Sequence, residues 1–348
     1  MSLFTCQPRA WKKLTTLTLS LGLAIAASSA TAATDIKLVL NWKYEGAQSW
    51  FFLAQEKGYF AEQDLNVTID QGEGSAASVP KVAAGVYDAG FGDTNALIQL
   101  ASSQPELAPV GVYMIYNTPP FVIAVKSDSP IEEPQDVEGK IIGAPANDGA
   151  LKLFPAFAKL TGIDTSKVTI NNMSPNLREQ LLMRGEIDAA FGYLTTISSS
   201  AKGMGLDPDK DLRFIRYGDH GMDLYSNTIF FSQDFIKTNP DAVRGFLVAL
   251  NQAIKDAVAN PDEAIDALMQ REPLLNRDLE KDKMLTTIRN DMSHPEIAEI
   301  GFGDVDDERL QKNIDIVVDA NQLDSKPDIR AIFDRSFLPE RASRPNAL

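Results

Sequence analysis

The strongest constraint on the fold is a short phrase that occurs twice in the chain. Residues 85–92 read GVYDAGFG and residues 185–192 read GEIDAAFG, so five of the eight positions are identical at a separation of 100 residues. A second match, VTI, occurs at 67–69 and again at 168–170. Chance explains one such phrase, but two matches in the same order indicate two related structural units.

Both units show the same predicted order of elements, strand–helix–strand–helix–strand. Short apolar runs predict buried strands, and apolar residues at helical spacing predict the helices between them. This order is typical of parallel strands joined by right-handed crossovers, with helices covering the sheet. The expected elements are 35–42, 47–60, 66–71, 72–85 and 87–93 in the first unit, and 140–145, 147–162, 167–172, 174–185 and 187–193 in the second.

The repeated phrase closes each unit. Gly85 and Gly185 are expected to end a helix, where a positive φ is easily adopted. Gly92 and Gly192 are expected to end the following strand and to let the backbone turn tightly. The phrase itself therefore predicts architecture, and ligand specificity is expected in the residues directly after it, where the two copies diverge.

Two extended, aromatic-rich stretches, residues 109–130 and 224–235, connect the units, and from Asn239 onward the spacing predicts helices. The predicted fold class is therefore α/β with two lobes, each a mostly parallel sheet covered by helices, and with a helical C-terminal part. The expected division is a signal peptide at 1–32, lobe 1 at 33–118 and 226–348, and lobe 2 at 119–225.

The first 32 residues are typical of a secretory signal peptide. Arg9, Lys12 and Lys13 precede an apolar stretch, and Ala30-Thr31-Ala32 provides a small-x-small cleavage site. A transmembrane anchor is the alternative, but the stretch is short and interrupted by Thr and Ser for a span of about 20 apolar residues. We therefore expect cleavage near Ala32 and a periplasmic protein.

The chain that would remain after cleavage is acidic and lacks cysteine. Cys6 is the one cysteine of the sequence, so disulfides, thiolate metal sites and cysteine nucleophiles are excluded from residues 33–348. These 316 residues carry 30 Lys and Arg against 48 Asp and Glu, a net charge of −18. Such a balance argues against nucleic acid and anionic membranes as partners.

Candidate ligand-binding residues follow the ends of the predicted strands, because open parallel sheets bind ligands outside the carboxyl ends of their strands. They combine aromatic planes and neutral hydrogen-bonding groups with a few carboxylates, which suits a small, flat, polar molecule. The candidates at strand ends are Asn41, Trp42, Tyr44, Ser75, Asp93, Thr94, Asp148, Gly149 and Tyr193; the linkers add Asn117, and Asp223 is a candidate to receive a ligand amine.

Several of these residues also have a purely structural interpretation. Trp42 could belong to the core, while Asp93, Ser75 and Gly149 could serve only as helix caps. Arg178, on a predicted helix, is interpreted as a surface or structural residue.

Catalytic and metal-binding signatures are weak. His220 and His294 lie 74 residues apart, and neither has the spacing of a metal site such as H-E-x-x-H. Neither the phosphate-binding pattern G-x-x-x-x-G-K-[ST] nor the nucleophile elbow G-x-S-x-G occurs. We therefore expect no catalytic residue, no metal and no cofactor.

Three stretches, residues 40–69, 74–93 and 177–192, resemble the periplasmic solute-binding proteins of the nitrate, sulfonate, taurine and thiamine-precursor class, the NMT1/THI5-like proteins. The resemblance extends over about residues 35–240. It implies a two-lobed type II periplasmic binding fold that closes like a hinge and delivers solute to the permease of an ABC transporter. The cleft positions of this class carry over to Asn41, Trp42, Ser75, Asp93, Asn117, Asp148, Gly149 and Tyr193.

The resemblance also implies the kind of ligand. The Asn41-Trp42 pair is similar to the pyrimidine-binding branch, so the expected ligand is a pyrimidine thiamine precursor or a similar aromatic heterocycle. An alkyl sulfonate or taurine-like anion held by helix N-termini is the alternative ligand. The expected partners are this small molecule and an ABC permease, with a monomer that meets the membrane only through the permease.

A related branch of the class implies an alternative activity. Enzymes of the thiamine pyrimidine synthase type make the pyrimidine from a pyridoxal cofactor and their own histidine. The signal peptide, the missing cysteine cluster and the isolated His220 and His294 argue against this alternative, so no enzyme activity is expected. A binding subunit of a sensor system fits the sequence as well as a transport protein does.

Overall fold

The computed structural model describes residues 1–5 and 33–348. The expected signal peptide and its cleavage site near Ala32 lie largely outside the described residues and stay a prediction. Met1–Ala32 and Ala33–Leu348 form separate units, and every helix and strand named below belongs to the second unit. In the part of the chain that the structure describes, no helix is long and apolar enough to cross a membrane.

The first sheet has five strands in the order β2-β1-β3-β10-β4. Strand β10 runs antiparallel to both of its neighbours, while β1 pairs in parallel with β2 and β3. The sheet is thus mostly parallel, as expected. Its strands are β1 (Thr34–Val39), β2 (Leu65–Asp70), β3 (Ala89–Asp93), β4 (Val110–Met114) and β10 (Asn227–Phe231).

The second sheet repeats this topology, with the order β7-β6-β8-β5-β9 and with β5 antiparallel to β8 and β9. The two antiparallel strands, β5 and β10, are those that enter each sheet from the aromatic connections between the units. The strands are β5 (Phe121–Lys126), β6 (Ile141–Ala144), β7 (Thr169–Asn172), β8 (Ala189–Tyr193) and β9 (Leu212–Arg216).

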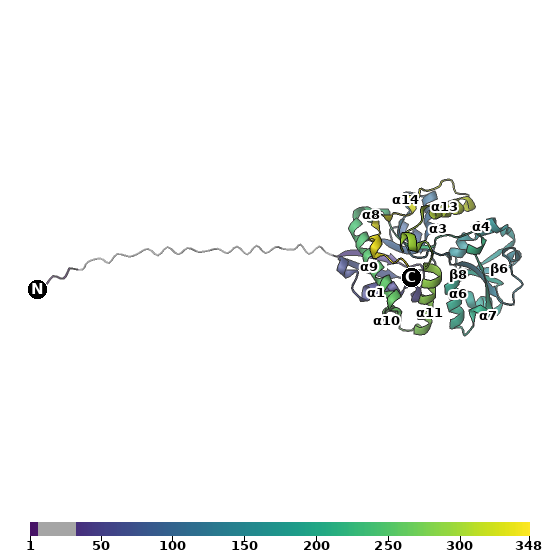
Figure 1. Ribbon diagram of the computed structural model, residues 1–348, viewed down its shortest axis with the longest axis horizontal. Helices are drawn as coiled ribbons and strands as arrows, with labels where there is room; N and C mark the ends of the chain where they lie inside the picture. Colours follow the sequence, from purple (N-terminus) through teal and green to yellow (C-terminus); the bar gives the residue numbers. More distant parts are fainter. Residues whose placement is uncertain (6–32) are drawn as a thin grey trace. The chain divides into compact units, whose positions relative to one another are not determined.

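Helices cover both sheets (Figure 1). In Figure 1, α4, α6 and α7 gather around the second sheet, in teal, and α1, α9 and α10 lie with the first. The helices are α1 (Ser49–Glu56), α2 (Ser78–Ala83), α3 (Thr94–Ser103), α4 (Gly149–Thr161), α5 (Arg178–Arg184), α6 (Leu194–Gly203), α7 (Pro208–Asp211), α8 (Gln233–Thr238), α9 (Pro240–Ala259), α10 (Pro261–Arg271), α11 (Arg277–Thr287), α12 (Ile297–Ile300), α13 (Asp307–Asn321) and α14 (Ile329–Ile332), with a π-helical turn at Ile288–Met292.

The strands of the first sheet lie within 33–118 and 226–348, and those of the second lie within 119–225. The helical C-terminal part contacts helices of both sheets: α9 and α10 pack on α1, α11 packs on α6, and α13 packs on α3 and α4. The proposed lobe boundaries stay a prediction, since residues Ala33–Leu348 form one compact unit.

The repeated aspartate of the phrase, directly before β3 or β8, ties that strand to its parallel neighbour. The Oδ2 atom of Asp88 accepts a 2.8 Å hydrogen bond from the backbone N–H of Lys37, at β1. The Oδ2 atom of Asp188 accepts one of the same length from Ile141, at β6. The first glycine of each copy has a φ of +70° or +71°, as expected for a helix end.

The last glycine of the phrase has a different role from the one expected. Gly92 and Gly192 lie inside β3 and β8, and neither has a positive φ, so they do not provide a tight turn. A Cβ on Gly92 would lie 2.6 Å from the carbonyl oxygen of Ser75, and one on Gly192 would lie 2.6 Å from the Nη1 atom of Arg178. The glycines are therefore required because the segment that precedes each strand packs directly against it.

Candidate functional site

A pocket lies at the carboxyl ends of the strands, between the two sheets. The space in it that a water-sized sphere can occupy is about 20 Å³, room for about one water molecule, so the walls lie close together in this structure. The pocket is lined by Asn41, Trp42, Ser75, Asp148, Arg178, Tyr193 and Thr196, of which all but Arg178 and Thr196 were expected.

Asp148 and Arg178 form one wall of the pocket. Asp148 caps the N-terminus of α4, since its Oδ1 atom accepts from the backbone N–H of Ala150 at 2.9 Å. Its Oδ2 atom lies 3.2 Å from the Nη1 atom of Arg178. The Nη2 atom of Arg178 lies 2.6 Å from Glu179, so one guanidinium is shared by two carboxylates.

Arg178, which was interpreted as a surface or structural residue, is 1 % exposed, so it does not lie on the surface. Burial opposes its charge, but Glu179 and Asp148 outweigh burial and raise the pKa of the guanidinium. Arg178 begins α5, after the end of β7, so the rule of strand carboxyl ends could have selected it. Thr196 lies likewise in the first turn of α6, after β8.

Trp42 presents the aromatic plane of the pocket and is 8 % exposed. The guanidinium of Arg178 lies 5.9 Å from the centre of its ring system, and the ammonium of Lys43 lies 6.0 Å away. The Nζ atom of Lys43 donates a 2.8 Å hydrogen bond to the side chain of Asn176 in the second sheet's β7–α5 connection. The indole is therefore held near the point where segments of the two sheets meet.

The Tyr193 hydroxyl joins the two walls at a cluster of buried polar groups. It lies 2.8 Å from the Oγ atom of Ser75, 3.0 Å from that of Ser226 and 3.0 Å from the Oδ1 atom of Asn227. A Cβ on Gly149 would lie 2.6 Å from the Ser75 hydroxyl and 2.9 Å from the Tyr193 hydroxyl. Glycine at 149 is thus what allows the walls to approach this closely.

Asp93 lies behind Ser75, whose carbonyl oxygen accepts from the Asp93 backbone N–H at 2.9 Å. Its Oδ1 atom accepts from the backbone and side chain of Asn95, at 3.1 and 2.8 Å, and so caps α3. Burial raises the pKa of Asp93 to about 7, against the hydrogen bonds from Asn95, and nearby Asp148 raises it further. Asp93 is 1 % exposed.

Buried polar atoms without a hydrogen-bond partner gather around the pocket. Such atoms cost free energy unless water or a ligand satisfies them, so each one calls for a physical account. Asp93 and Asn227 are cross-strand neighbours in register, and each contributes one such atom. Within residues 33–348, the unpartnered atoms near the pocket are Gln48 Oε1, Asp93 Oδ2, Asn95 Oδ1, Thr195 Oγ1 and Asn227 Nδ2.

Tyr44 and Thr94, two of the expected ligand contacts, do not line the pocket. The Tyr44 hydroxyl donates to the carbonyl oxygen of Ile69 at 2.9 Å, and its ring packs edge-on against Phe52 at 5.2 Å. The Thr94 hydroxyl donates to the carbonyl oxygen of Ser226 at 2.6 Å. Both side chains are thus used in packing the first sheet.

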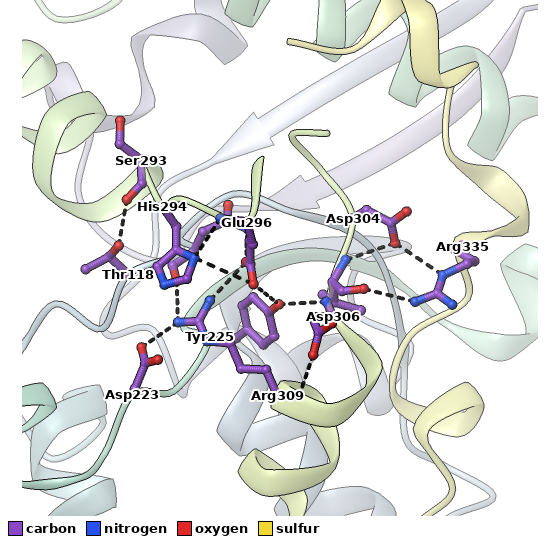
Figure 2. A network of polar contacts seen from close by, with 12 residues as sticks. Thr118, Asp223, Tyr225, Ser293, His294, Glu296, Asp304, Asp306, Arg309 and Arg335 are labelled. Atoms are coloured by element: carbon purple, nitrogen blue, oxygen red, sulfur yellow. Dashed lines mark hydrogen bonds and ion pairs between the residues drawn. The ribbon is translucent and has the colours of Figure 1, made fainter. Parts of the chain in front are cut away.

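Asn117 and Asp223 also lie outside the pocket. Asp223 belongs to a polar network that Arg309 joins (Figure 2), and Arg309 also contacts Asn117. The Nη2 atom of Arg309 donates to the carbonyl oxygen of Asn117 at 2.6 Å and to Asp223 at 2.8 Å. Its Nη1 atom lies 2.9 Å from Glu296, which also accepts from the Tyr225 hydroxyl at 2.8 Å. Arg309 therefore holds both connecting segments at once.

The charges of the pocket disfavour an anionic ligand. Arg178 is the single basic residue of the lining, and Asp148 and Glu179 already share it. Asp93 adds a third carboxyl group close by. The lining therefore offers no uncompensated cation to a sulfonate or nitrate, and the nearby Lys43 ammonium lies outside the lining and donates to Asn176. A neutral or cationic ligand is favoured.

Curated relatives of known function match most of this chain. A riboflavin-binding protein of Chloroflexus aurantiacus is 23% identical over 297 residues, which is 83% of this chain and 82% of the relative. A 4-amino-5-hydroxymethyl-2-methylpyrimidine phosphate synthase of Saccharomyces cerevisiae is 27% identical, over 71% of this chain and 74% of its own. A formylaminopyrimidine-binding protein of Halalkalibacterium halodurans is 22% identical, over 72% and 74%.

Solved structures with the same fold include two sulfonate-binding proteins. The aliphatic sulphonate-binding protein of Escherichia coli has a TM-score of 0.64 and 14% identity, over 85% of this chain and 91% of its own. The alkanesulfonate-binding protein of Xanthomonas axonopodis pv. citri has a TM-score of 0.65 and 17% identity, over 88% and 100%. This likeness confirms the predicted two-lobed periplasmic binding fold.

A family model described as NMT1/THI5 like matches residues 48–264. The matched region contains most of the pocket lining and both copies of the repeated phrase. Because the match covers more than half of the chain, this protein belongs to the NMT1/THI5-like family, as the resemblance of its sequence implied.

Proposed function

We propose that this chain is an extracytoplasmic solute-binding protein. It captures a small, flat, neutral or cationic heterocycle between its two lobes and delivers it to an ABC importer. The preferred ligand is a pyrimidine thiamine precursor. The observation that supports this most is the pocket itself, in which an indole plane stands beside polar groups and the one lining cation is already paired.

The details of the pocket agree with an aminopyrimidine. Its ring can stack on Trp42, as flat π-systems do on tryptophan. The carboxylate of Asp148 and the amide of Asn41 can accept from an exocyclic amine, while the unpartnered atoms of Asp93 and Asn227 remain for further polar groups.

An alkyl sulfonate is less well supported. The solved sulfonate-binding proteins share the fold at 14% and 17% identity, which does not extend to the ligand. A buried anion would need an uncompensated cation or several free donors, and among the described residues near the pocket Asn227 Nδ2 is the one unpartnered nitrogen. Arg178 is already shared between Asp148 and Glu179.

The synthase alternative is likewise less well supported. His220 stacks edge-on against Phe157 at 5.6 Å, and His294 accepts from the Glu296 backbone N–H at 3.3 Å. Neither histidine lines the pocket, so neither is placed to give its ring to a reaction there. Among residues 1–5 and 33–348, no group of His, Cys, Asp or Glu is arranged to hold a metal ion.

Calorimetric titration tests the proposal directly. Protein purified without refolding would first be analysed by native mass spectrometry, to identify and remove any bound molecule. It would then be titrated with 4-amino-5-hydroxymethyl-2-methylpyrimidine, with its formylamino analogue, with riboflavin and with an alkyl sulfonate. We expect saturable binding of a pyrimidine that is recovered unaltered.

Other outcomes would contradict specific parts of the proposal. Sulfonate binding without pyrimidine binding would refute the ligand. A turnover product or a pyridoxal adduct would refute the role in transport. Export is tested separately, by N-terminal sequencing of protein from the periplasmic fraction, where a chain beginning near Ala33 is expected.

A further inference from the structure

A buried ion cluster lies outside the pocket and contacts the loop that carries two of its residues. The Nζ atom of Lys283 lies 2.8 Å from Glu45 and 3.4 Å from Glu280. The three side chains are at most 8% exposed. Burial disfavours the Lys283 charge, but Glu45 and Glu280 outweigh burial and raise the pKa of the ammonium.

This cluster joins segments that are far apart in the sequence. Glu45 ends the loop that begins with Asn41 and Trp42 after β1, while Lys283 and Glu280 belong to α11. The backbone N–H of Gly46 donates to the Oε2 atom of Glu280 at 2.6 Å. The loop and α11 are thus held by both side-chain and backbone contacts.

The loop lies directly on the backbone of α11. A Cβ on Gly46 would lie only 3.1 Å from the backbone nitrogen of Met284 and still closer to the backbone of Glu280. The hydroxyl of Ser49 lies 3.1 Å from the sulfur of Met284. There is no space for the loop to move toward the helix, so α11 limits where the loop can lie.

A neighbouring face of α11 contacts α6, the helix that carries the pocket residue Thr196. Asp282 lies 2.6 Å from the ammonium of Lys202, and Leu279 packs on Gly203. Both contacts are at the C-terminal end of α6, whose first turn carries the pocket residue Thr196. Helix α11 therefore touches the loop with one face and α6 with another.

We propose that Lys283 is a positioning residue for ligand binding: through Glu45 and Glu280 it holds the loop that carries Asn41 and Trp42 against α11. Lys283 does not line the pocket, so it acts through the loop and not through a contact with ligand. The inference rests on the proposed function in placing ligand at this pocket. Without the ammonium, two carboxylates would remain buried beside each other, and the loop would lose its attachment.

The test follows Trp42 in the ligand-free protein and the affinity for the pyrimidine. The protein is labelled with 5-fluorotryptophan, and the Trp42 fluorine resonance is assigned from its loss in Trp42→Phe. In Lys283→Met we expect this resonance to shift or broaden, and the Kd for 4-amino-5-hydroxymethyl-2-methylpyrimidine to rise on the order of tenfold or more. Lys281→Met is the matched control, since Lys281 of the same helix pairs with Asp262 at 2.7 Å and is 33% exposed.

A second variant separates positioning from stability. Glu45→Gln combined with Lys283→Met removes the repulsion between buried carboxylates as well as the attachment, so it should fold more stably than Lys283→Met alone while the Trp42 resonance stays displaced. A wild-type Trp42 resonance in either folded variant would overturn the inference. If the wild-type protein binds no pyrimidine, the proposed function fails, while the Trp42 resonance still decides the role of Lys283.

Discussion

Burial of the Asp93 carboxyl group has a measurable effect on stability. Its pKa is raised to about 7 from an ordinary value of 3.8. The folded protein therefore keeps this proton up to about pH 7, while the unfolded chain releases it near pH 4. Since the folded state binds the extra proton in this interval, ionisation of Asp93 lowers stability as the pH rises from about 4 to about 7.

The Asp93→Asn variant removes this ionisation and keeps an oxygen that can accept from Asn95. The shift of about 3 pKa units corresponds to about 4 kcal/mol. The free energy of unfolding of the variant, minus that of the wild-type protein, should therefore rise by about 2 kcal/mol from pH 4 to pH 5.5 and by about 4 kcal/mol by pH 8. The difference between the two proteins is used because Asp291, whose pKa burial also raises to about 7, contributes to the pH dependence of both.

Urea denaturation at a series of pH values measures this difference. The control is Asp128→Asn, whose side chain is 80% exposed and for which no such rise is expected. The free energy of unfolding of Asp93→Asn, minus that of the wild-type protein, could instead stay constant from pH 4 to pH 8. This result would show that burial does not hold Asp93 protonated, and it would refute the reasoning.

Three further predictions concern the pocket and the connecting segments. Trp42→Ala should weaken pyrimidine binding by about 1–3 kcal/mol in titration calorimetry, because it removes the stacking plane, and unchanged affinity would place the ligand elsewhere. Gly149→Ala should weaken binding on the order of tenfold and give a more open small-angle scattering profile, because its Cβ would collide with Ser75 and Tyr193 in the closed form; a wild-type profile and affinity would contradict this. Arg309→Met should lower the free energy of unfolding by about 3 kcal/mol in urea, since it leaves the buried Asn117 carbonyl and the mostly buried Glu296 carboxylate without this donor; an unchanged free energy of unfolding would contradict this role of Arg309.

The repeated phrase predicted the two related units correctly, because its aspartate and its first glycine have the same structural role in both copies. The aspartates at 88 and 188 accept from backbone N–H groups of β1 and β6, and the first glycines follow helices with nearly equal φ. The role of Gly92 and Gly192 was missed, because close packing of a preceding segment against a strand leaves no periodic signal in the sequence. The antiparallel direction of β5 and β10 was missed for a similar reason, since it depends on long-range pairing.

The site was predicted in part. The rule of strand carboxyl ends placed Asn41, Trp42 and Tyr193 in the pocket, since it depends only on strand order. It could not exclude Asn117 or Asp223, which also follow strands but are held by Arg309 of α13. Their partner, Arg309, lies many residues away in the sequence, and no local sequence pattern indicates the contact.

The sequence by itself determined the two α/β units, the acidic and cysteine-free character of residues 33–348, and the set of polar and aromatic residues at the strand ends, because these depend on composition and local periodicity. The tertiary structure alone decided which of these residues face one another. Arg178 is buried beside Asp148 and Glu179, and Lys283 pairs with Glu45, which lies 238 positions away in the sequence. Buried charges are stable only beside oppositely charged partners, and the fold alone determines which partners are near.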